Sequence, residues 1–380
     1  MVNALTIDLE DYFQVHAFSS VIRFEDWGNH ESRIERNTHR LLEILRESGI
    51  AHSAERIANE LTPDDSRLTP DVSGGTPHSL HLTPYASPKA TFFILGWIAE
   101  RYPHLIRTIK DQGHEIASHG YAHKLIYTQS KEEFRNDIRK AKAILEDITG
   151  DYVIGYRAPS YSITNKSQWA FEVLMEEGFK YDSSIFPIHH DFYGFPQAPR
   201  FPFLISMNGN NNFEFSTLNL NLEVTPQSAI RNPHSSTQSS VPITPNLKPQ
   251  HRCTAARQHF FSPHSSHLTP NGSLIEFPLS TVRFAGQNVP ISGGGYFRLF
   301  PYSIIKKGLT RINRIEGMPF IFYIHPWELD PNQPRINSTS VLSKFRHYIN
   351  LDKTELRFKQ LLTDFNFSSI KDLLETNVST

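Results

Sequence analysis

Two histidines four residues apart, His119 and His123, have the types and spacing that could do chemistry. They follow a short predicted strand over residues 114–118, and Gly120 lets the chain turn directly after it. Both imidazoles can then face one point, as binding of a single metal ion requires. Two loop histidines without a ligand would show the same spacing. The metal interpretation therefore depends on a carboxylate ligand and on catalytic partners elsewhere in the chain.

Three carboxylates follow the first apolar run of the chain. Residues 3–7 predict a buried strand, and Asp8, Glu10 and Asp11 come directly after it. Acids this close repel one another unless a positive charge lies among them, and a bound cation would supply that charge. A solvated acidic turn explains the same cluster without a ligand. The acids alone leave both interpretations open.

Polar side chains also follow three later predicted strands. They are Arg157 and Tyr161 after residues 152–156, Asp182 after residues 179–181, and His325 after residues 319–324. Each has a structural explanation when taken alone: a surface cation, a turn cap or a core histidine. Because the carboxyl ends of parallel strands meet on one face, five such strand ends together favour a functional site.

Strands and helices alternate along most of the chain, which predicts an α/β fold with a mostly parallel sheet, either a barrel or a wound sheet. The predicted strands lie at residues 3–7, 90–96, 114–118, 152–156, 179–181, 274–280 and 319–324, and the helices at 31–48, 97–112, 131–148, 168–177, 301–314 and within 340–375. In either architecture the polar strand ends would gather at the same face.

Two segments interrupt this alternation. Residues 62–88 and 206–272 are rich in Pro, Ser, Thr, Asn and His and lack apolar periodicity, so we interpret both as low-complexity insertions. The remainder predicts one domain over residues 1–380, with residues 340–380 forming a helical closure. We expect a deletion of residues 210–270 to leave folding intact.

Composition narrows the class of protein. The net charge is −1, which gives no support to nucleic-acid binding. The N-terminus lacks a basic region followed by an apolar segment of signal length, and no apolar run approaches the ~20 residues that cross a bilayer. We therefore expect a cytoplasmic protein or one on the inner face of the membrane. The single cysteine, Cys253, excludes an internal disulfide and leaves His and carboxylate as metal ligands.

Seven motifs together resemble the polysaccharide deacetylases of carbohydrate esterase family four, the nodulation-type deacetylase homology domain. The resemblance is closer to the branch found with exopolysaccharide clusters of exosortase-bearing bacteria. The motifs are TIDLEDYFQ at 6–14, ATFF at 90–93, SHGYAH at 118–123, RAPSY at 157–161, YDSS at 181–184, GGGYFR at 293–298 and YIHPW at 323–327. They cover nearly all of the chain outside the two insertions.

The resemblance implies a distorted (β/α) barrel, usually of seven strands, that removes acetyl groups from N-acetylated sugars with one divalent metal, commonly zinc. His119, His123 and one carboxylate would hold the metal, which suits a site with open positions for water and a substrate carbonyl. By the same resemblance Asp8 is the general base, and Arg157 keeps Asp8 ionised and oriented.

The family pattern also assigns roles at the later strand ends. It implies that the backbone NH of Tyr161 helps to bind the oxyanion and that His325 protonates the leaving amine. Asp182 would fix the tautomer of His325 or raise its basicity. The residues that we expect to contact the sugar are Trp327, Tyr296, Phe297 and Pro159.

One departure from the family concerns the carboxylate ligand. The family has two adjacent aspartates, whereas Asp8 is followed by Leu9, Glu10 and Asp11. We favour Asp11 as the ligand because a turn could bring it back beside Asp8, and Glu10 is the alternative. The sequence does not choose among zinc, cobalt, nickel and manganese.

The expected partner is an N-acetylated polysaccharide or a lipid-linked glycan, with peripheral contact to a membrane biosynthetic complex and no nucleic acid. Two other functions stay open at this stage. One is an amidase that opens a small cyclic ureide, since related barrels share the metal ligands, and a deep closed pocket would favour it. The other is a carbohydrate-binding protein without catalysis, which would need no paired acid and base.

Overall fold

The computed structural model describes residues 1–60, 87–190, 193–208, 212–218, 272–337 and 340–378. Nearly all of the first predicted insertion, residues 62–88, and most of the second, at 219–271, lie outside the described residues. The structural statements below concern the described part of the chain.

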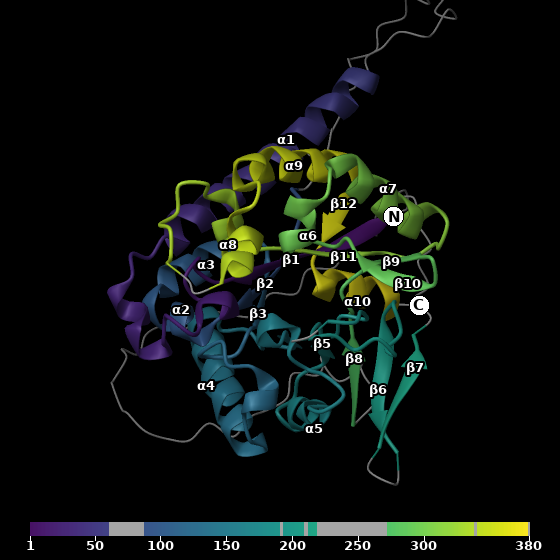
Figure 1. The fold of residues 1–380 in the computed structure, drawn as a ribbon. Coiled ribbons are helices and arrows are strands. Elements are labelled where there is room, and N and C mark those ends of the chain that lie inside the picture. The colour runs from purple at the N-terminus through teal and green to yellow at the C-terminus, as the bar shows by residue number, and fades with distance from the viewer. Residues whose placement is uncertain (61–86, 191–192, 209–211, 219–271, 338–339, 379–380) are drawn as a thin grey trace, which may run out of the picture.

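Seven parallel strands form the centre of the fold, in the order β11-β1-β2-β3-β4-β5-β8 (Figure 1). Their bounds are β1 Val2–Leu9, β2 Thr91–Ile94, β3 Glu115–Ser118, β4 Gly155–Tyr156, β5 Tyr181–Asp182, β8 Ser273–Glu276 and β11 Ile321–Ile324. The predicted α/β class and the parallel order of these seven strands are confirmed, and β12 Asn366–Ser368 pairs parallel with β1 as an eighth. All residues of β1 after Val2 are buried, as expected for a parallel strand covered on both faces.

The sheet curls but does not close into a barrel through backbone pairing among the described residues. Its two ends, β8 and β11, approach each other just beyond β8, where the backbone NH of Ile321 donates to Ser280 Oγ at 2.8 Å. Side chains also bridge the interior, because Arg157 after β4 reaches Thr6 and Asp8 on β1. The parallel strands of the expected distorted barrel are therefore observed as a curved sheet, and the barrel is not closed among the described residues.

Helices cover this sheet (Figure 1). They are α1 Ile34–Glu60, α2 Gly96–Arg101, α3 Pro103–Asp111, α4 Lys131–Thr149, α5 Trp169–Glu176, α6 Gly294–Leu299, α7 Tyr302–Arg314, α8 Val341–Tyr348, α9 Leu351–Asp364 and α10 Ile370–Val378. Short 3-10 helices are η1 His16–Phe18, η2 Phe24–Asn29, η3 Ile126–Thr128, η4 Pro159–Tyr161 and η6 Pro326–Leu329. None of the helices that the structure describes is both long and apolar enough to span a membrane.

Two predicted helices differ from the observed ones for local reasons. The helix expected over 97–112 is divided between α2 and α3, because Pro103 has no NH for a continuous ladder and begins the second helix. The helix expected to end at Gly49 continues to Glu60, so this glycine does not stop it.

The prediction that residues 206–272 form an insertion without strands is wrong for the first part of that segment. Strands β6 Phe203–Met207 and β7 Phe213–Thr217 pair antiparallel and add to the edge of β8. A deletion of residues 210–270 would remove β7, so the expectation of intact folding does not extend to that boundary. Sequence reasoning also missed the hairpin β9 Thr281–Phe284 and β10 Gln287–Pro290, and strand β12 Asn366–Ser368.

The triple glycine at residues 293–295 allows a close approach of two backbones. A Cβ on Gly293, whose φ is +139°, would lie 1.9 Å from the carbonyl oxygen of Tyr323 on β11. Gly294 has a φ of +52° and begins α6, and both Gly294 and Gly295 line the cleft described below. This glycine turn therefore lines the cleft and also begins a helix.

Candidate active site

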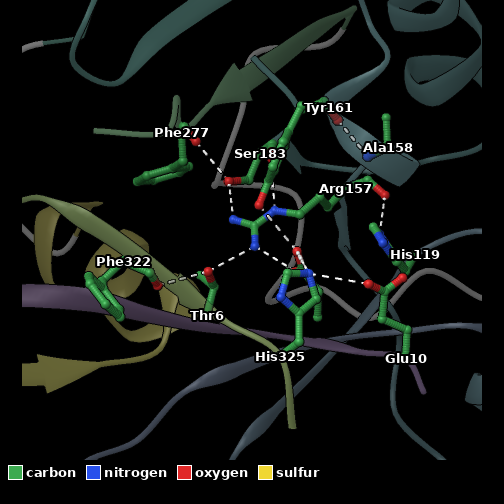
Figure 2. Close-up of polar contacts among 12 residues, drawn as sticks. Thr6, Glu10, His119, Arg157, Ala158, Tyr161, Ser183, Phe277, Phe322 and His325 are labelled. Atoms are coloured by element: carbon green, nitrogen blue, oxygen red, sulfur yellow. Dashed lines mark hydrogen bonds and ion pairs between the residues drawn. The ribbon is translucent and has the colours of Figure 1, made fainter. Parts of the chain in front are cut away.

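A cleft of about 610 Å³ lies at the carboxyl ends of the parallel strands. Asp8 and Glu10 lie at the end of β1, and His119 and His123 follow β3. His325 follows β11, and Figure 2 shows it close to Glu10. Its aromatic lining is Tyr127, Tyr161, Tyr193, Tyr296, Tyr323, Trp327 and Phe345. The predicted convergence of the strand ends is thus observed, although the strands are far apart in sequence.

Glu10, His119 and His123 form a cluster whose ligand atoms all lie within 4.8 Å of one another. Glu10 Oε2 is 2.9 Å from His123 Nε2. His119 directs Nδ1 to the carbonyl oxygen of Arg157 at 2.8 Å, which leaves its Nε2 for the cluster. Burial lowers the pKa of His119 to about 4, so this imidazole is neutral, the form that binds metal.

The cluster fits a divalent ion by its donor set. Glu10 Oε2 is buried, and although His123 Nε2 lies 2.9 Å away, the two atoms are not aligned as a hydrogen bond. This arrangement is expected where a cation would lie between a carboxylate and an imidazole. Burial raises the pKa of Glu10, but the charges of His123 and His325 outweigh it and bring that pKa to about 2. The carboxylate is therefore ionised, and two imidazoles with one carboxylate form a common metal site with open positions.

Asp11, the ligand that sequence reasoning preferred, does not belong to this cluster. Its Oδ2 accepts the backbone NH groups of Arg33 and Ile34 at 2.7 and 3.2 Å and the hydroxyl of Ser32 at 2.9 Å. These groups are at the start of α1, where the first amides have no partner within the helix. Asp11 therefore caps the start of α1. Glu10, the alternative ligand, is the carboxylate that lies with the two histidines.

Paired substitutions distinguish these two carboxylates. Glu10→Gln is expected to weaken metal binding at least about tenfold, because an amide carries no charge to hold the ion. Asp11→Asn is expected to keep the metal and to lower the free energy of unfolding by about 1 kcal/mol through the weakened cap. Metal content after dialysis and urea denaturation measure the two effects. Equal metal loss in both variants would contradict the assignment.

Asp8 is held in a buried ion pair with Arg157. Arg157 Nη1 donates to Asp8 Oδ1 at 2.7 Å and to Thr6 Oγ1 at 2.8 Å, while Nε and Nη2 donate to the backbone carbonyl and hydroxyl of Ser183 (Figure 2). Burial alone would raise the pKa of Asp8, but the charges of Arg157 and His325 outweigh it, so the pKa lies below its ordinary value. The predicted orienting role of Arg157 matches this geometry.

The backbone NH of Tyr161, predicted to bind an oxyanion, is used inside a turn. It donates to the carbonyl oxygen of Ala158 at 3.0 Å. Ser160 and Tyr161 both have left-handed backbones, with φ of 51° and 53°, an uncommon and costly conformation for two successive residues with side chains. This turn points the hydroxyl of Tyr161 at Asp8 Oδ2, 3.3 Å away. The side chain, and not the amide, is therefore the group of Tyr161 that faces the cleft.

His325 is oriented by Glu328, a residue that sequence reasoning missed. Its Nδ1 lies 2.7 Å from Glu328 Oε1, and Glu328 Oε2 accepts from Arg298 Nε at 2.6 Å. Burial lowers the pKa of His325, but the hydrogen bond to Glu328 and the charge of Glu10 raise it to about 9. The signal was local: Glu328 lies three residues after His325, and its carboxylate also accepts the backbone NH of His325.

Asp182, predicted to be the partner of His325, instead pairs with a second buried carboxyl group. It is the strand neighbour of Glu276, and Asp182 Oδ2 and Glu276 Oε2 are both buried without a hydrogen-bond partner among the described residues. A proton between the two carboxyl groups would satisfy both. Asp182 Oδ1 also accepts from Ser184 Oγ at 2.5 Å, and Glu276 Oε1 accepts the NH of Ile185 at 2.8 Å. Burial raises the pKa of both acids, and two carboxyl groups in this arrangement share one proton.

This shared proton predicts a pH-dependent stability. A raised folded pKa gives stability that is complete below the unfolded pKa of about 4 and is lost as pH rises through the folded value. Burial and the charge of Asp182 hold the folded pKa of Glu276 well above its ordinary range. Glu276→Gln supplies the bridging hydrogen permanently. We expect its unfolding free energy to fall less steeply than that of the wild type between about pH 5 and pH 8, by up to about 1.4 kcal/mol per pH unit. Urea denaturation measures both slopes, and parallel slopes would exclude a shared proton.

Two of the four predicted substrate contacts are wrong. Phe297 is fully buried and packs edge-on against Phe322, with ring centroids 4.9 Å apart. Pro159 is also buried, and its neighbour Ser160 lines the cleft instead. Tyr296 and Trp327 do line the cleft. The cleft is also lined by residues that sequence reasoning did not single out: His16, His190, Tyr193, Arg346 and His347.

Part of the chain that forms this site matches a known protein family. Residues 55–176, which include both histidines of the cluster and Arg157, match the family described as polysaccharide deacetylase. This part of the chain is similar to polysaccharide deacetylases. The sequence resemblance to this family is confirmed, whereas the exosortase-associated branch stays a prediction.

Individual relatives agree with the family match. The chain is 33% identical over 134 residues to a peptidoglycan deacetylase of Helicobacter pylori and 36% identical over 114 residues to a peptidoglycan-N-acetylglucosamine deacetylase of Bacillus cereus. These matches cover 35% and 30% of this chain and 44% and 40% of the relatives, less than half their length. A solved family 4 carbohydrate esterase from Streptomyces lividans aligns with a TM-score of 0.29 at 18% identity, covering 48% of this chain and 61% of the other.

The candidate site uses residues outside the stretch that matches the polysaccharide deacetylase family. Residues 243–375 match a domain of unknown function, DUF3473. This second match contains β8 and β11, and therefore Glu276, His325, Glu328 and Arg298. Strand β1, with Asp8 and Glu10, precedes both matches. One curved sheet thus combines three stretches of sequence into a single cleft.

Proposed function

We propose that this chain is a metal-dependent hydrolase that removes N-acetyl groups from N-acetylhexosamine units of a polysaccharide or its precursor. The observation that carries the proposal is the placement, in one cleft, of an ionised buried aspartate, a carboxylate with two histidines, and a histidine held by its own carboxylate. Amide hydrolysis needs these three elements: a base, an electrophile and an acid.

Each protein group has a step that its surroundings support. Asp8, kept ionised by Arg157, takes a proton from the attacking water. His325, held through Nδ1 by Glu328, presents Nε2 to the cleft and gives a proton to the leaving amine. The hydroxyl of Tyr161 lies beside Asp8 and can donate to oxygen as charge develops there.

Glu10, His119 and His123 would hold the metal. A divalent ion bound there would acidify a water and polarise the acetyl carbonyl. Zinc is the proposed native ion, since imidazole with carboxylate suits it. Zinc identity, cytoplasmic location at the membrane and a role in exopolysaccharide synthesis rest on the sequence resemblance and belong to this proposal.

The cleft supports a sugar substrate over a small ureide. Tyr193, Tyr296 and Trp327 contribute aromatic side chains to its wall, and aromatic side chains contact the apolar sides of sugars. Two relatives are named as deacetylases of peptidoglycan, which makes N-acetylglucosamine polymers the first substrates to test. A carbohydrate-binding protein without catalysis would not require the buried pairs Asp8 with Arg157 and His325 with Glu328.

Acetate release from N-acetylglucosamine oligomers tests the proposal. We expect release that stops with a chelator and returns with zinc. Metal-loaded protein that releases no acetate from these oligomers, or from acetylated exopolysaccharide, would overturn the deacetylase assignment. Ring opening of a cyclic ureide by the same sample would favour the amidase. Acetate release that is unchanged after complete metal removal would overturn metal dependence.

A further inference from the structure

The solvent face of α8 is apolar, which is unusual for a surface helix. Val341, Leu342 and Phe345 are 84%, 54% and 52% exposed, and helical spacing places them on one side together with Arg346. The opposite side is packed: His347 is buried and stacks on Trp327 with centroids 4.2 Å apart. The helix is therefore anchored through its polar residues and presents apolar ones outward.

This apolar face adjoins the mouth of the catalytic cleft. Phe345 and Arg346 line the cleft, as does Leu299 at the end of α6, which is 44% exposed. The two helices touch, since a Cβ on Gly295 would lie 4.0 Å from the carbonyl oxygen of Arg346. We call Val341, Leu342, Phe345 and Leu299 the α8 surface. It extends an entrance wall of the cleft outward.

The charge around the α8 surface is positive. Residues 331–350 contain Arg335, Lys344 and Arg346 and no acid, in a chain whose net charge is −1. None of the three cations forms an ion pair with a described carboxylate, and Arg335 instead stacks over the Tyr348 ring at 4.2 Å. A neighbour of this surface would therefore gain from being both apolar and anionic.

We propose that the α8 surface docks on an anionic phospholipid bilayer. Exposed aliphatic and aromatic side chains flanked by Lys and Arg have the chemistry of a helix lying in a membrane interface. A neutral glycan would not use the cations, and a second copy of a chain with this net charge offers them no general attraction. Docking would place the cleft mouth at the headgroups, where a lipid-linked acetylated glycan is displayed. This last consequence rests on the proposed function, whereas bilayer binding does not.

Vesicle flotation of the full chain tests the docking. We expect binding to phosphatidylcholine vesicles that contain phosphatidylglycerol, weaker binding at high salt, and little binding to phosphatidylcholine alone. Val341→Ser with Leu342→Ser should lower the partition coefficient about tenfold, and Arg335→Gln with Lys344→Gln should do so by a similar factor. None of these four side chains lines the cleft.

Phe284→Ser with Ile315→Ser is the matched control, because these side chains are 74% and 75% exposed. Phe284 ends β9 and Ile315 directly follows α7, and Figure 1 shows both elements away from α8. Unchanged partition in this control supports the proposal, whereas an equal loss would overturn it. Absence of wild-type binding to anionic vesicles would also overturn it.

Two further readouts identify a different occupant. A wild-type dimer that Val341→Ser with Leu342→Ser converts to a monomer would assign the α8 surface to a second copy and overturn bilayer docking. A loss of activity on soluble acetylated oligomers in that variant, with vesicle binding intact, would assign it to glycan. Vesicle binding without acetate release from any glycan would leave the docking standing and reject the proposed function.

Discussion

Replacement of Asp8 by asparagine is expected to lower kcat for acetate release about a thousandfold or more. The asparagine side chain can still accept a hydrogen bond from Arg157 but cannot take a proton from water, and general bases contribute about 10²–10⁴ to rate. Metal content should stay close to that of the wild type, since Glu10, His119 and His123 are untouched. Steady-state kinetics with metal analysis on the same sample measures both effects.

The matched control for this prediction is Asp11→Asn, a buried carboxylate three residues away that serves the start of α1. Its activity should remain within a few-fold of the wild type once it is folded. An Asp8→Asn variant that retained a tenth of wild-type kcat would exclude Asp8 as the base. So would a loss of metal large enough to account for the whole decrease.

The sequence allowed prediction of the site's location because a parallel sheet has one chemical face. Asp8, His119, Arg157 and His325 each follow a recognisable apolar strand, and parallel order brings such strand ends together whatever lies between them. Chain pattern therefore predicts which groups meet. It does not by itself predict which atoms face one another.

The choice between Glu10 and Asp11 could have been made from the alternation of side chains along the first strand. Side chains alternate along an extended strand, so Glu10, two residues after Asp8, shares its side. Asp11 is on the other side and meets the start of α1, more than twenty residues away. That contact depends on how a helix packs on the sheet, which no local pattern reports.

The partners of His325 and Asp182 show a different limit. Glu276 is more than ninety residues after Asp182 in the chain, and it reaches Asp182 only because β8 pairs with β5. The resemblance to the family predicted that Asp182 contacts His325. In the structure Asp182 lies beside Glu276, and His325 hydrogen-bonds Glu328. Tertiary pairing of buried acids must be seen in three dimensions.

Replacement of Arg157 by methionine is expected to be among the most destabilising single changes in this protein. Arg157 is fully buried, and its removal would leave Asp8 charged without its partner and Ser183 and Thr6 without donors. Loss of one member of a buried ion pair costs about 3–5 kcal/mol of unfolding free energy. Methionine keeps most of the volume, so a cavity contributes little, and urea denaturation measures the loss.

A double-mutant cycle separates the ion pair from the other contacts of Arg157. In an Asp8→Asn background the charge that needs neutralising is already gone, so Arg157→Met should cost less there, by about 1–3 kcal/mol. Equal losses in both backgrounds would mean that Arg157 acts through Ser183, Thr6 and the Phe93 ring, 4.1 Å from its guanidinium carbon, rather than through Asp8. The ion pair between Arg157 and Asp8 would then contribute little to the free energy of unfolding, and the low pKa of Asp8 would need another cause. A positive coupling instead ties folding and catalysis to the same buried charge, because the arginine that stabilises the sheet interior is also what keeps the base ionised.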